Sequence, residues 1–434
     1  MKNLKNLFTL YILFVFSVSN IYPQTRNVIW VHGFNGDASA WGHYDTIFSA
    51  ERKISSLRVK YTTNDGLDKA AKELNKSIND KFGNGAQNTS NLAIGHSMGG
   101  IMIREQERNP SFSPETKAKI GGYITIASPN MGAPVSDNIL KLIVDQAAVT
   151  AFNSLISGPS FMAFPVLWTI ISGFTPNFVA EKFKIGLKGD LASIPTNQDL
   201  KEGSNAINLI NNFNSSLPRI SIIAQENSPV HWRMIGTQLF GPVVWAYVSY
   251  IGTFPVSGDD LMVFLADQMQ GVYKSQYLTH TSLAATNFFN PPAATYHLLA
   301  ASKWKEGKDW FENSETIWSS LIKTSRVETY TYWIEEWAPC PPKPKPIPDC
   351  GEWVYVEMTG TKTVNYPSDG LLPTYAQELK GVSGSNKYII NSANHLELKN
   401  MKYSKLPNGQ QNDGTKNTLN AIFDSYGWFN TPRN

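Results

Sequence analysis

Between residues 28 and 127 the sequence alternates short apolar segments with segments whose apolar residues recur at helical spacing. Strands are expected at 28–31, 56–63, 91–94 and 123–127. The clearest helical stripe consists of Leu67, Ala71, Leu74, Ile78 and Phe82, and Asp65 just upstream is expected to cap its N-terminus. A second helix is expected around Trp41, Tyr44 and Phe48, and a third from Ile101 to Glu107, before Asn109-Pro110. Strands that alternate with helices predict an α/β fold whose mostly parallel sheet has helices on both faces.

The alternation is interrupted by two long insertions, after which core segments return. Core strands are expected again at 219–224 and 388–391, with a closing helix near 418–423, and the strands of a β-hairpin at 329–337 and 352–357. We therefore divide the chain into a leader at 1–22, core at 23–134, a helical cap insertion at 135–217, a core strand at 218–227, a second insertion at 228–326, the β-hairpin at 327–358, and core at 359–434.

The N-terminus has the pattern of a signal peptide. Lys2 and Lys5 precede the apolar run Leu7–Val18, and Ser17-Val18-Ser19 provides the small residues that a signal peptidase requires. An uncleaved membrane anchor is the alternative, but a run of about twelve apolar residues is shorter than the roughly 20 that span a bilayer. The sequence thus predicts a secreted or periplasmic protein whose mature chain has no transmembrane helix.

Cys340 and Cys350 are the two cysteines of the chain, and they flank a proline-rich segment. In an exported protein this arrangement indicates a disulfide that closes the tip of the predicted hairpin. A zinc site is the alternative, but two thiols without a nearby histidine are a poor ligand set.

Composition excludes two classes of protein. Hydrophobic residues make up 42% of the chain and aromatic residues 12%, which is too apolar for a disordered protein. Lys and Arg number 38 against 35 Asp and Glu, and no extended basic block stands out. A nucleic-acid partner is therefore not expected.

The segment Gly95-His96-Ser97-Met98-Gly99-Gly100 fits the pattern G-x-S-x-G between a predicted strand and a predicted helix. A serine on a tight strand-to-helix turn needs small neighbours, and the helix N-terminus stabilises developing negative charge. Ser97 is therefore the expected nucleophile. His96 is expected to be structural, because its adjacent position points its side chain elsewhere.

With this motif the chain resembles the α/β-hydrolase family, and within it the secreted bacterial lipases and esterases. Val31-His32-Gly33-Phe34 resembles the His-Gly-hydrophobic segment of that family, and the resemblance implies that the backbone N–H groups of Phe34 and Met98 form the oxyanion hole. Two further segments are similar to lipase motifs: Ser128–Pro134, in which Asn130 replaces a histidine, and Asp199–Asn211.

The acid and base of such a hydrolase follow the serine in the order Asp or Glu, then His. Asp369, in Ser368–Pro373, resembles the acid loop of the family, and His395 directly follows the last predicted strand. His395 would accept the proton of Ser97, and Asp369 would fix the histidine tautomer and stabilise the imidazolium. Glu226 and the pair Asp259 and Asp260 are competing acids for which surface or capping roles are expected. His231, His280 and His297 are expected to be ordinary polar residues of the insertions.

No cofactor is expected, since the sequence has no phosphate loop or dinucleotide fingerprint. Some related lipases place a calcium ligand two residues after the catalytic histidine, where this chain has Glu397, but a further glutamine ligand has no match at Met401. The resemblance therefore leaves a calcium site open without predicting one.

Three functions are compatible with these residues. The first is a secreted lipase or esterase that cleaves esters of hydrophobic acyl groups through an acyl-enzyme, with apolar insertions forming a cap that can contact a lipid interface. The second is a deacylase or acyltransferase for phospholipid-type substrates, because water and alcohols attack the same intermediate. The third is a noncatalytic surface-binding protein on a hydrolase fold, which the intact Ser, Asp and His set disfavours.

Overall fold

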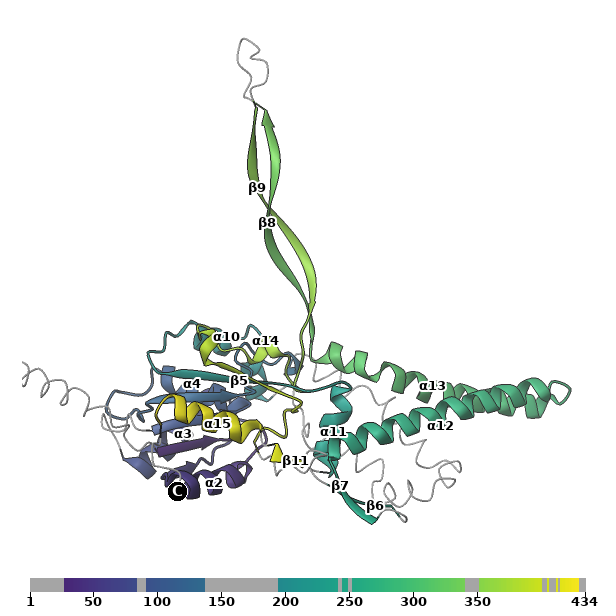
Figure 1. The fold of residues 1–434 in the computed structure, drawn as a ribbon, viewed down its shortest axis with the longest axis horizontal. Helices are drawn as coiled ribbons and strands as arrows, with labels where there is room; N and C mark the ends of the chain where they lie inside the picture. The colour runs from purple at the N-terminus through teal and green to yellow at the C-terminus, as the bar shows by residue number, and fades with distance from the viewer. Residues whose placement is uncertain are drawn as a thin grey trace, which may run out of the picture.

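The central feature of the computed structural model is a six-stranded, entirely parallel sheet (Figure 1). The structure describes residues 27–83, 91–136, 194–240, 244–248, 252–339, 351–399, 404–405, 411–412 and 414–428. The sheet strands are β1 (Asn27–Val31), β2 (Ser56–Arg58), β3 (Asn91–His96), β4 (Gly122–Ile126), β5 (Arg219–Gln225) and β10 (Lys387–Asn391). The predicted α/β fold with a parallel sheet is confirmed.

The strand order in this sheet is β10-β5-β4-β3-β1-β2. From β1 the chain first adds β2 on one side, and it then crosses to build β3, β4, β5 and β10 on the other side. The order therefore reverses between β1 and β3, whose pairing runs from Asn27 opposite Asn91 to Val31 opposite Gly95. In open parallel sheets the crevice at such a reversal, beyond the carboxyl ends of the strands, is the usual ligand site.

Helices cover both faces of the sheet because successive strand side chains point to opposite sides. In β1, Val28 and Trp30 pack with η1 (Ala38–Trp41), α2 (Gly42–Arg52) and α15 (Gly414–Ser425). Ile29 and Val31 pack on the other face with α3 (Leu67–Phe82) and α4 (Met98–Arg108). Two short helices, α9 (Pro195–Leu200) and α10 (Asn205–Asn212), join that second face.

Two sequence predictions in this region are wrong in detail. The strand expected at 56–63 is paired only from Ser56 to Arg58, so β2 is a short edge strand. Asp65 does not cap α3, because it forms an ion pair with Lys69 instead. The cap comes from a distant segment: the Asp199 carboxylate accepts a hydrogen bond of 2.9 Å from the Leu67 N–H. A local pattern cannot reveal a cap supplied from so far along the chain.

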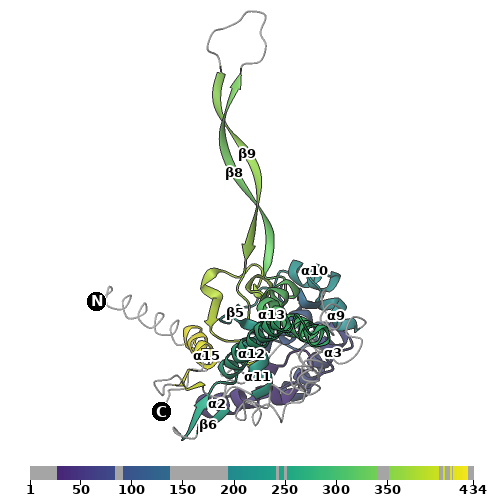
Figure 2. The same cartoon turned by 90° about the vertical axis from the view of Figure 1, so that its right-hand side faces the viewer.

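The second insertion forms a helical arm, which we define as α12 (Gly258–Thr286) and α13 (Pro291–Leu321). The two helices lie side by side and extend away from the sheet (Figures 1 and 2). The arm is preceded by α11 (Val230–Phe240) and by a small antiparallel pair, β6 (Val244–Val248) and β7 (Gly252–Val256). The second insertion is mainly helical, but most of the arm projects outward, and the two helices bury residues such as Ala284 and Ala301.

A second projection is the β-arm, the antiparallel hairpin of β8 (Ser325–Pro339) and β9 (Gly351–Asn365). Each strand has 15 residues, so the hairpin is much longer than the predicted strands at 329–337 and 352–357. The β-arm stands away from the core in both views (Figures 1 and 2). The remaining short elements are α14 (Thr374–Gln377), η3 (Gly384–Asn386), β11 (Ser404–Lys405) and β12 (Gln411–Asn412).

Several predictions concern residues outside those that the structure describes. They are the signal peptide at 1–22, most of the cap insertion at 135–217, and the pairing of Cys340 with Cys350. Among the helices that are described, none combines the length and the apolar character needed to cross a membrane.

Candidate active site

Ser97 lies on the turn between β3 and α4, where the sheet order reverses. Its backbone has φ 56° and ψ −131°, a conformation that L-residues rarely adopt. Its N–H donates to the Ile126 carbonyl of the neighbouring strand β4, at 2.9 Å. Strain of this kind is typical of a nucleophile elbow, which lifts the serine hydroxyl above the sheet edge.

The glycines around Ser97 permit this turn by allowing two close backbone approaches. A Cβ atom on Gly95 would lie 2.5 Å from the backbone of Gly99 and Gly100. A Cβ atom on Gly99 would lie 2.6 Å from the His32 carbonyl oxygen. Real Cβ contacts are never so short, so α4 can pack against β1 and β3 only if these positions lack side chains.

The segment predicted to supply the oxyanion hole lies directly beside Ser97. A Cβ atom on Gly33 would come within 3.3 Å of the Ser97 Oγ, so this backbone follows the hydroxyl closely. Upstream, the His32 ring stacks on Tyr61 with ring centroids 4.2 Å apart, and its Nδ1 donates to the Gly33 carbonyl. Met98 is the first residue of α4, where a backbone N–H has no acceptor within the helix.

His395 and Asp369 meet although 26 positions separate them in the sequence. The His395 Nδ1–H donates to the Asp369 Oδ2 at 2.7 Å, and the His395 backbone N–H donates to the Asp369 carbonyl, also at 2.7 Å. Both side chains are buried. Because Nδ1 carries the hydrogen in this bond, Nε2 is the ring nitrogen of His395 that can accept a proton.

The Asp369 carboxylate is held by its own loop. Its Oδ1 accepts hydrogen bonds from the backbone N–H groups of Leu371 and Leu372, at 2.9 and 2.7 Å. Its Oδ2 is thereby left to face His395. The two backbone bonds thus fix the orientation of the Asp369 carboxylate toward the imidazole of His395.

Two residues that the sequence analysis missed fix the acid loop. The buried Gln377 bridges this loop to β5, since its Nε2 donates to the carbonyls of Leu372 and Ala224 and its Oε1 accepts from the Ala224 N–H. The Trp318 indole, near the end of α13, donates to the Gly370 carbonyl at 2.8 Å. Neither residue belongs to a recognisable motif, so only the fold reveals them.

His96 is structural, as expected. It is buried, its Nε2 donates to the His395 carbonyl at 2.9 Å, and its ring lies 4.7 Å from the His395 ring between centroids. Burial lowers the pKa of His96 well below its usual value, so it is neutral at physiological pH. The strand residue beside Ser97 thus positions the backbone of His395, the candidate base.

A buried polar network holds the loop after β4 in place. The Arg104 guanidinium donates to the side-chain oxygens of Asn130 and Asn211, at 3.1 and 2.6 Å. In turn, the Asn130 amide donates to the Gln377 carbonyl at 2.8 Å. Asn130, which replaces the histidine of the similar lipase motif, therefore connects α4 to the segment that follows the candidate acid Asp369.

The competing acids have other partners. Glu226 accepts from the Asn227 N–H, and burial raises its pKa to about 7. Asp259 and Asp260 both pair with Arg233, at 2.8 and 2.7 Å, and they lie in the first turn of α12. Asp259 and Asp260 thus lie at the start of a helix, but the surface or capping role expected of Glu226 is wrong, because this residue is buried and bonds to its own neighbour.

Glu397, the residue considered for calcium, is held by protein groups. One oxygen of its carboxylate accepts from the Thr237 hydroxyl and the other from the Asn394 N–H. Burial raises its pKa to about 8, so it is mostly protonated at neutral pH. Within the described part of the chain, no three His, Cys, Asp or Glu residues are grouped so that they could hold a metal ion.

Comparison with known proteins matches residues 24–155 to a family described as "Putative serine esterase (DUF676)". A comparison with curated proteins gave no match. The family match covers β1, the oxyanion segment and the nucleophile turn.

Three solved structures are similar over part of their length. Phospholipase PlaB from Legionella pneumophila aligns over 49% of this chain and 41% of its own, at 16% identity and a TM-score of 0.31. An extracellular α/β-hydrolase from a Paenibacillus species covers 45% and 76%, at 14% identity and a TM-score of 0.26. The lipase BlEst2 from Bacillus licheniformis covers 50% and 75%, at 14% identity and a TM-score of 0.25. This chain thus spans less than half the length of PlaB.

The parallel sheet with its reversal at β1 and β3 and the strained Ser97 turn are those of the α/β-hydrolase fold, and residues 24–155 match a family described as putative serine esterases.

Proposed function

We propose that this protein is a carboxylic ester hydrolase in which Ser97, His395 and Asp369 form a catalytic triad. The observation that carries the proposal is the buried hydrogen bond from His395 Nδ1 to Asp369, beside a strained serine turn at the same edge of the sheet. An Asp–His pair of this geometry is what a serine needs in order to become nucleophilic.

In the acylation step, the Ser97 hydroxyl attacks the ester carbonyl while the Nε2 of His395 accepts its proton. The charge on the imidazolium is balanced by Asp369 through the Nδ1–H bond. Negative charge on the former carbonyl oxygen is stabilised by the backbone N–H groups of Phe34 and Met98. The imidazolium then protonates the leaving alkoxide, so an alcohol departs and an ester of Ser97 remains.

Deacylation repeats these steps with water as the nucleophile. His395 accepts a proton from the water, the hydroxide adds to the acyl carbonyl, and the proton returns to the Ser97 oxygen when the acid leaves. An alcohol in place of water would give acyl transfer, because it attacks the same intermediate. Hydrolysis and transfer thus differ only in what reaches the acyl-enzyme.

Hydrophobic acyl groups are the substrate class that we favour. The side chains of Val230 and Met234, on α11, lie against the acid loop at Gly370, and Trp318 bonds to the same glycine. Apolar side chains therefore approach the triad from the second insertion. Apolar surroundings of this kind suit acyl chains better than charged substrates.

The proposal is tested by hydrolysis of p-nitrophenyl esters of increasing acyl length, with Ser97→Ala as the control. We expect activity that rises with acyl length and disappears in Ser97→Ala. Added alcohol separates the alternatives, since formation of a new ester at the expense of free acid would indicate an acyltransferase. No activity with any ester, together with no labelling by an organophosphate, would favour a noncatalytic binding protein.

We also propose that the protein works outside the cytoplasm, as a secreted or periplasmic enzyme. The support is the charged and apolar pattern of the first 22 residues. Sequencing the N-terminus of the exported protein tests this, and we expect a new terminus near residue 22. A terminus at Met1 in the membrane fraction would favour an uncleaved anchor.

A further inference from the structure

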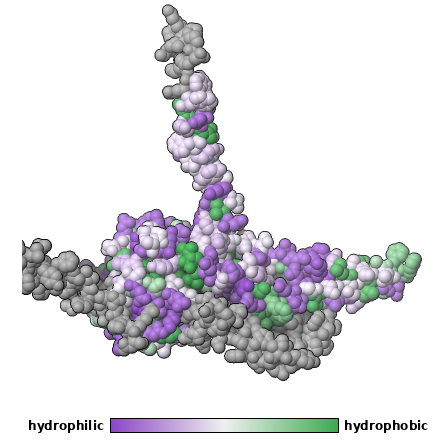
Figure 3. Space-filling view, in the orientation of Figure 1, coloured by the Kyte–Doolittle hydropathy of each residue, from purple (hydrophilic) through white to green (hydrophobic). Residues whose placement is uncertain are grey.

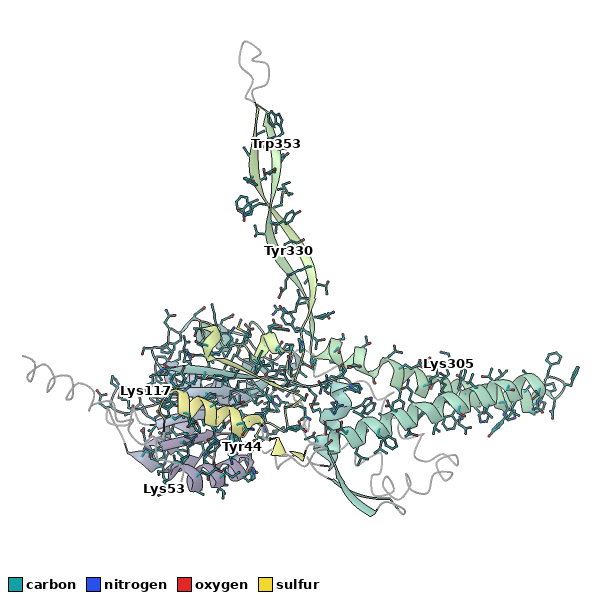
Figure 4. The ribbon with its side chains drawn as sticks, viewed as in Figure 1. Tyr44, Lys53, Lys117, Lys305, Tyr330 and Trp353 are labelled. Atoms are coloured by element: carbon teal, nitrogen blue, oxygen red, sulfur yellow. The ribbon has the colours of Figure 1, made fainter. Side chains whose placement is uncertain are left out.

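The outer half of the helical arm carries no formally charged side chain. No Asp, Glu, Lys or Arg occurs between Lys274 on α12 and Lys303 on α13. The inner half differs sharply, because its ion pairs include Lys305 with Asp309 and Lys308 with Glu312. Figure 4 labels Lys305 on the arm. Helices that face water normally carry many charged side chains. The lack of such side chains indicates that the outer half contacts something other than water.

Large apolar side chains are exposed throughout this outer half. Phe288 and Phe289, in the loop that joins the two helices, are 72% and 94% exposed. Figure 3 shows the apolar end of the arm in green. Other exposed apolar residues of the outer half are Leu278, Leu283, Tyr296, Leu298 and Leu299.

These residues surround the arm rather than forming one stripe. Tyr296 and Leu298 are two residues apart on α13, which places them on nearly opposite sides of that helix. Phe288 and Phe289 lie beyond the ends of both helices. A partner helix or a second copy of the chain would cover one stripe along a helix, whereas an apolar solvent would surround the whole end.

Several polar groups near the end of the arm are bonded within it. The side-chain amide of Asn287 and the hydroxyl of Thr286 both donate to the Leu283 carbonyl, at 2.8 and 3.1 Å. The loop backbone closes on itself, with Asn290 N–H donating to the Asn287 carbonyl at 2.8 Å. Between the helices, His280 and His297 bond through their Nδ1 atoms at 2.9 Å. Internal pairing of this kind is what a hydrocarbon environment demands.

The β-arm, which also exposes large apolar residues, lacks these properties. Glu335, Glu336 and Glu357 lie among its aromatic residues, and the Tyr355 hydroxyl bonds to Glu335. Among the described residues its two strands pair only with each other, so each presents an unpaired backbone edge there. Exposed sheet edges are not tolerated in hydrocarbon. The helical arm is therefore the better candidate for contact with lipid.

We propose that the outer half of the helical arm inserts into a lipid bilayer and anchors the enzyme there. From Ser275 to Thr286 the helix is about 18 Å long, close to the roughly 15 Å of one hydrocarbon leaflet. The arm enters one leaflet and does not span the membrane. Trp318, near the base of α13, bonds to the acid loop, so the inner half of the arm, roughly 22 Å of helix from Lys303 to Trp318, joins the inserted part to the active site.

The proposal is tested by flotation of the full chain with vesicles of pure phosphatidylcholine. Flotation measures binding to the vesicles and does not depend on hydrolysis. We expect the protein to float with the vesicles, with little change in high salt, because the inserted part has no charge. Phe288→Ser with Phe289→Ser should lower the partition coefficient roughly 100-fold, since two exposed aromatic anchors are lost. The matched control is Leu209→Ser with Ile389→Ser, which removes two exposed apolar residues of the core and should float like the wild type.

Two further measurements separate a loss of membrane binding from a loss of folding or of activity. Thermal unfolding should be the same in both double variants, and hydrogen exchange at residues 275–302 of the wild type should slow when vesicles are added. A wild type that does not float overturns the proposal, as does equal loss in the core control. Loss of flotation in Trp333→Ser with Trp353→Ser, but not in the phenylalanine variant, would assign the membrane contact to the β-arm. If the protein self-associates through Phe288 and Phe289 and does not float, the outer half of the arm binds a second copy of the chain and not a bilayer.

Discussion

The large aromatic residues of this protein fall into two groups with opposite surroundings. In the core, Trp30, Trp41 and Tyr44 are fully buried beneath the helices that cover the sheet. In the two arms, residues such as Phe289 and Trp353 are largely exposed, and Trp353 lies on the outer part of the β-arm (Figure 4). Burial in the core fixes the positions of catalytic groups, whereas exposure in the arms leaves surface for contact with other molecules.

The two regions meet at the acid loop. The Trp318 indole of the helical arm bonds to Gly370, and at the base of the β-arm the Tyr366 N–H donates to the Thr324 carbonyl. The Arg326 guanidinium lies 4.3 Å from the centre of the Tyr375 ring, just after that loop. We therefore expect changes in the core to alter chemistry and changes in the outer parts of the two arms to leave it unaltered.

The largest effect is expected from the nucleophile and the base. Ser97→Ala and His395→Ala should each lower kcat by roughly 10⁶-fold, and the double variant should be no worse, because the two residues act as one unit. Steady-state hydrolysis of a soluble short-chain ester measures this. Additive losses in the double variant would break the assignment of the triad.

The acid residue gives the next largest effect. Asp369→Asn should lower kcat by roughly 10⁴-fold with folding intact, since an amide at this position no longer selects the tautomer with a proton on Nδ1. Glu226→Gln is the matched control. It should leave kcat almost unchanged, because the Glu226 carboxylate bonds to its neighbour Asn227 and not to His395. The reverse ranking would transfer the acid role to Glu226.

The pH dependence of stability should report on the buried acids of the core. Burial raises the pKa of Glu226 to about 7 and that of Glu397 to about 8, from an ordinary value near 4.5. The folded protein therefore holds more protons than the unfolded chain between about pH 4.5 and 8, and these groups lose their stabilising contribution as pH rises through that window.

Glu226→Gln with Glu397→Gln should remove this dependence. The melting temperature of the double variant, relative to wild type, should increase from pH 5 to pH 9. Comparing the two proteins cancels the opposite contribution of His96, whose lowered pKa destabilises the fold at acidic pH. A constant difference across the range would mean that these carboxyl groups are ionised in the folded protein.

The smallest effect on catalysis is expected at the end of the β-arm. Cys340→Ser with Cys350→Ser should cost roughly 2–3 kcal/mol in stability where the predicted disulfide restricts the unfolded chain. Activity on a soluble ester should change by less than about twofold, since the register from Pro339 opposite Gly351 to Ser325 opposite Asn365 separates the cysteines from the acid loop. A large loss of activity, or free thiols in the exported protein, would contradict this account.

The parts of the fold that the sequence predicted are those with short-range signals. The stripe from Leu67 to Phe82 and the apolar runs of β1, β3 and β4 depend on periodicity within a few residues, and the structure confirms them. The cap of α3 by Asp199 and the length of the β-arm depend on residues distant in sequence. Local patterns contain no information about such contacts.

The residues of the candidate site also differ in whether the sequence alone could identify them. Ser97, Asp369 and His395 stand in recognisable motifs, so they could be named before the fold was known. Gln377 and Arg104 hold the loops around them through buried hydrogen bonds. An isolated glutamine or arginine in a sequence has many ordinary uses, so only the three-dimensional arrangement distinguishes these two.

The most direct test of the central claim is labelling of the intact protein with a fluorophosphonate, followed by peptide mass spectrometry. Only an activated serine reacts rapidly with such a reagent. The account predicts one adduct, on Ser97, which is absent or greatly slowed in His395→Ala and unchanged in Phe288→Ser with Phe289→Ser. An adduct on another serine, or none at all in a folded protein, would contradict it.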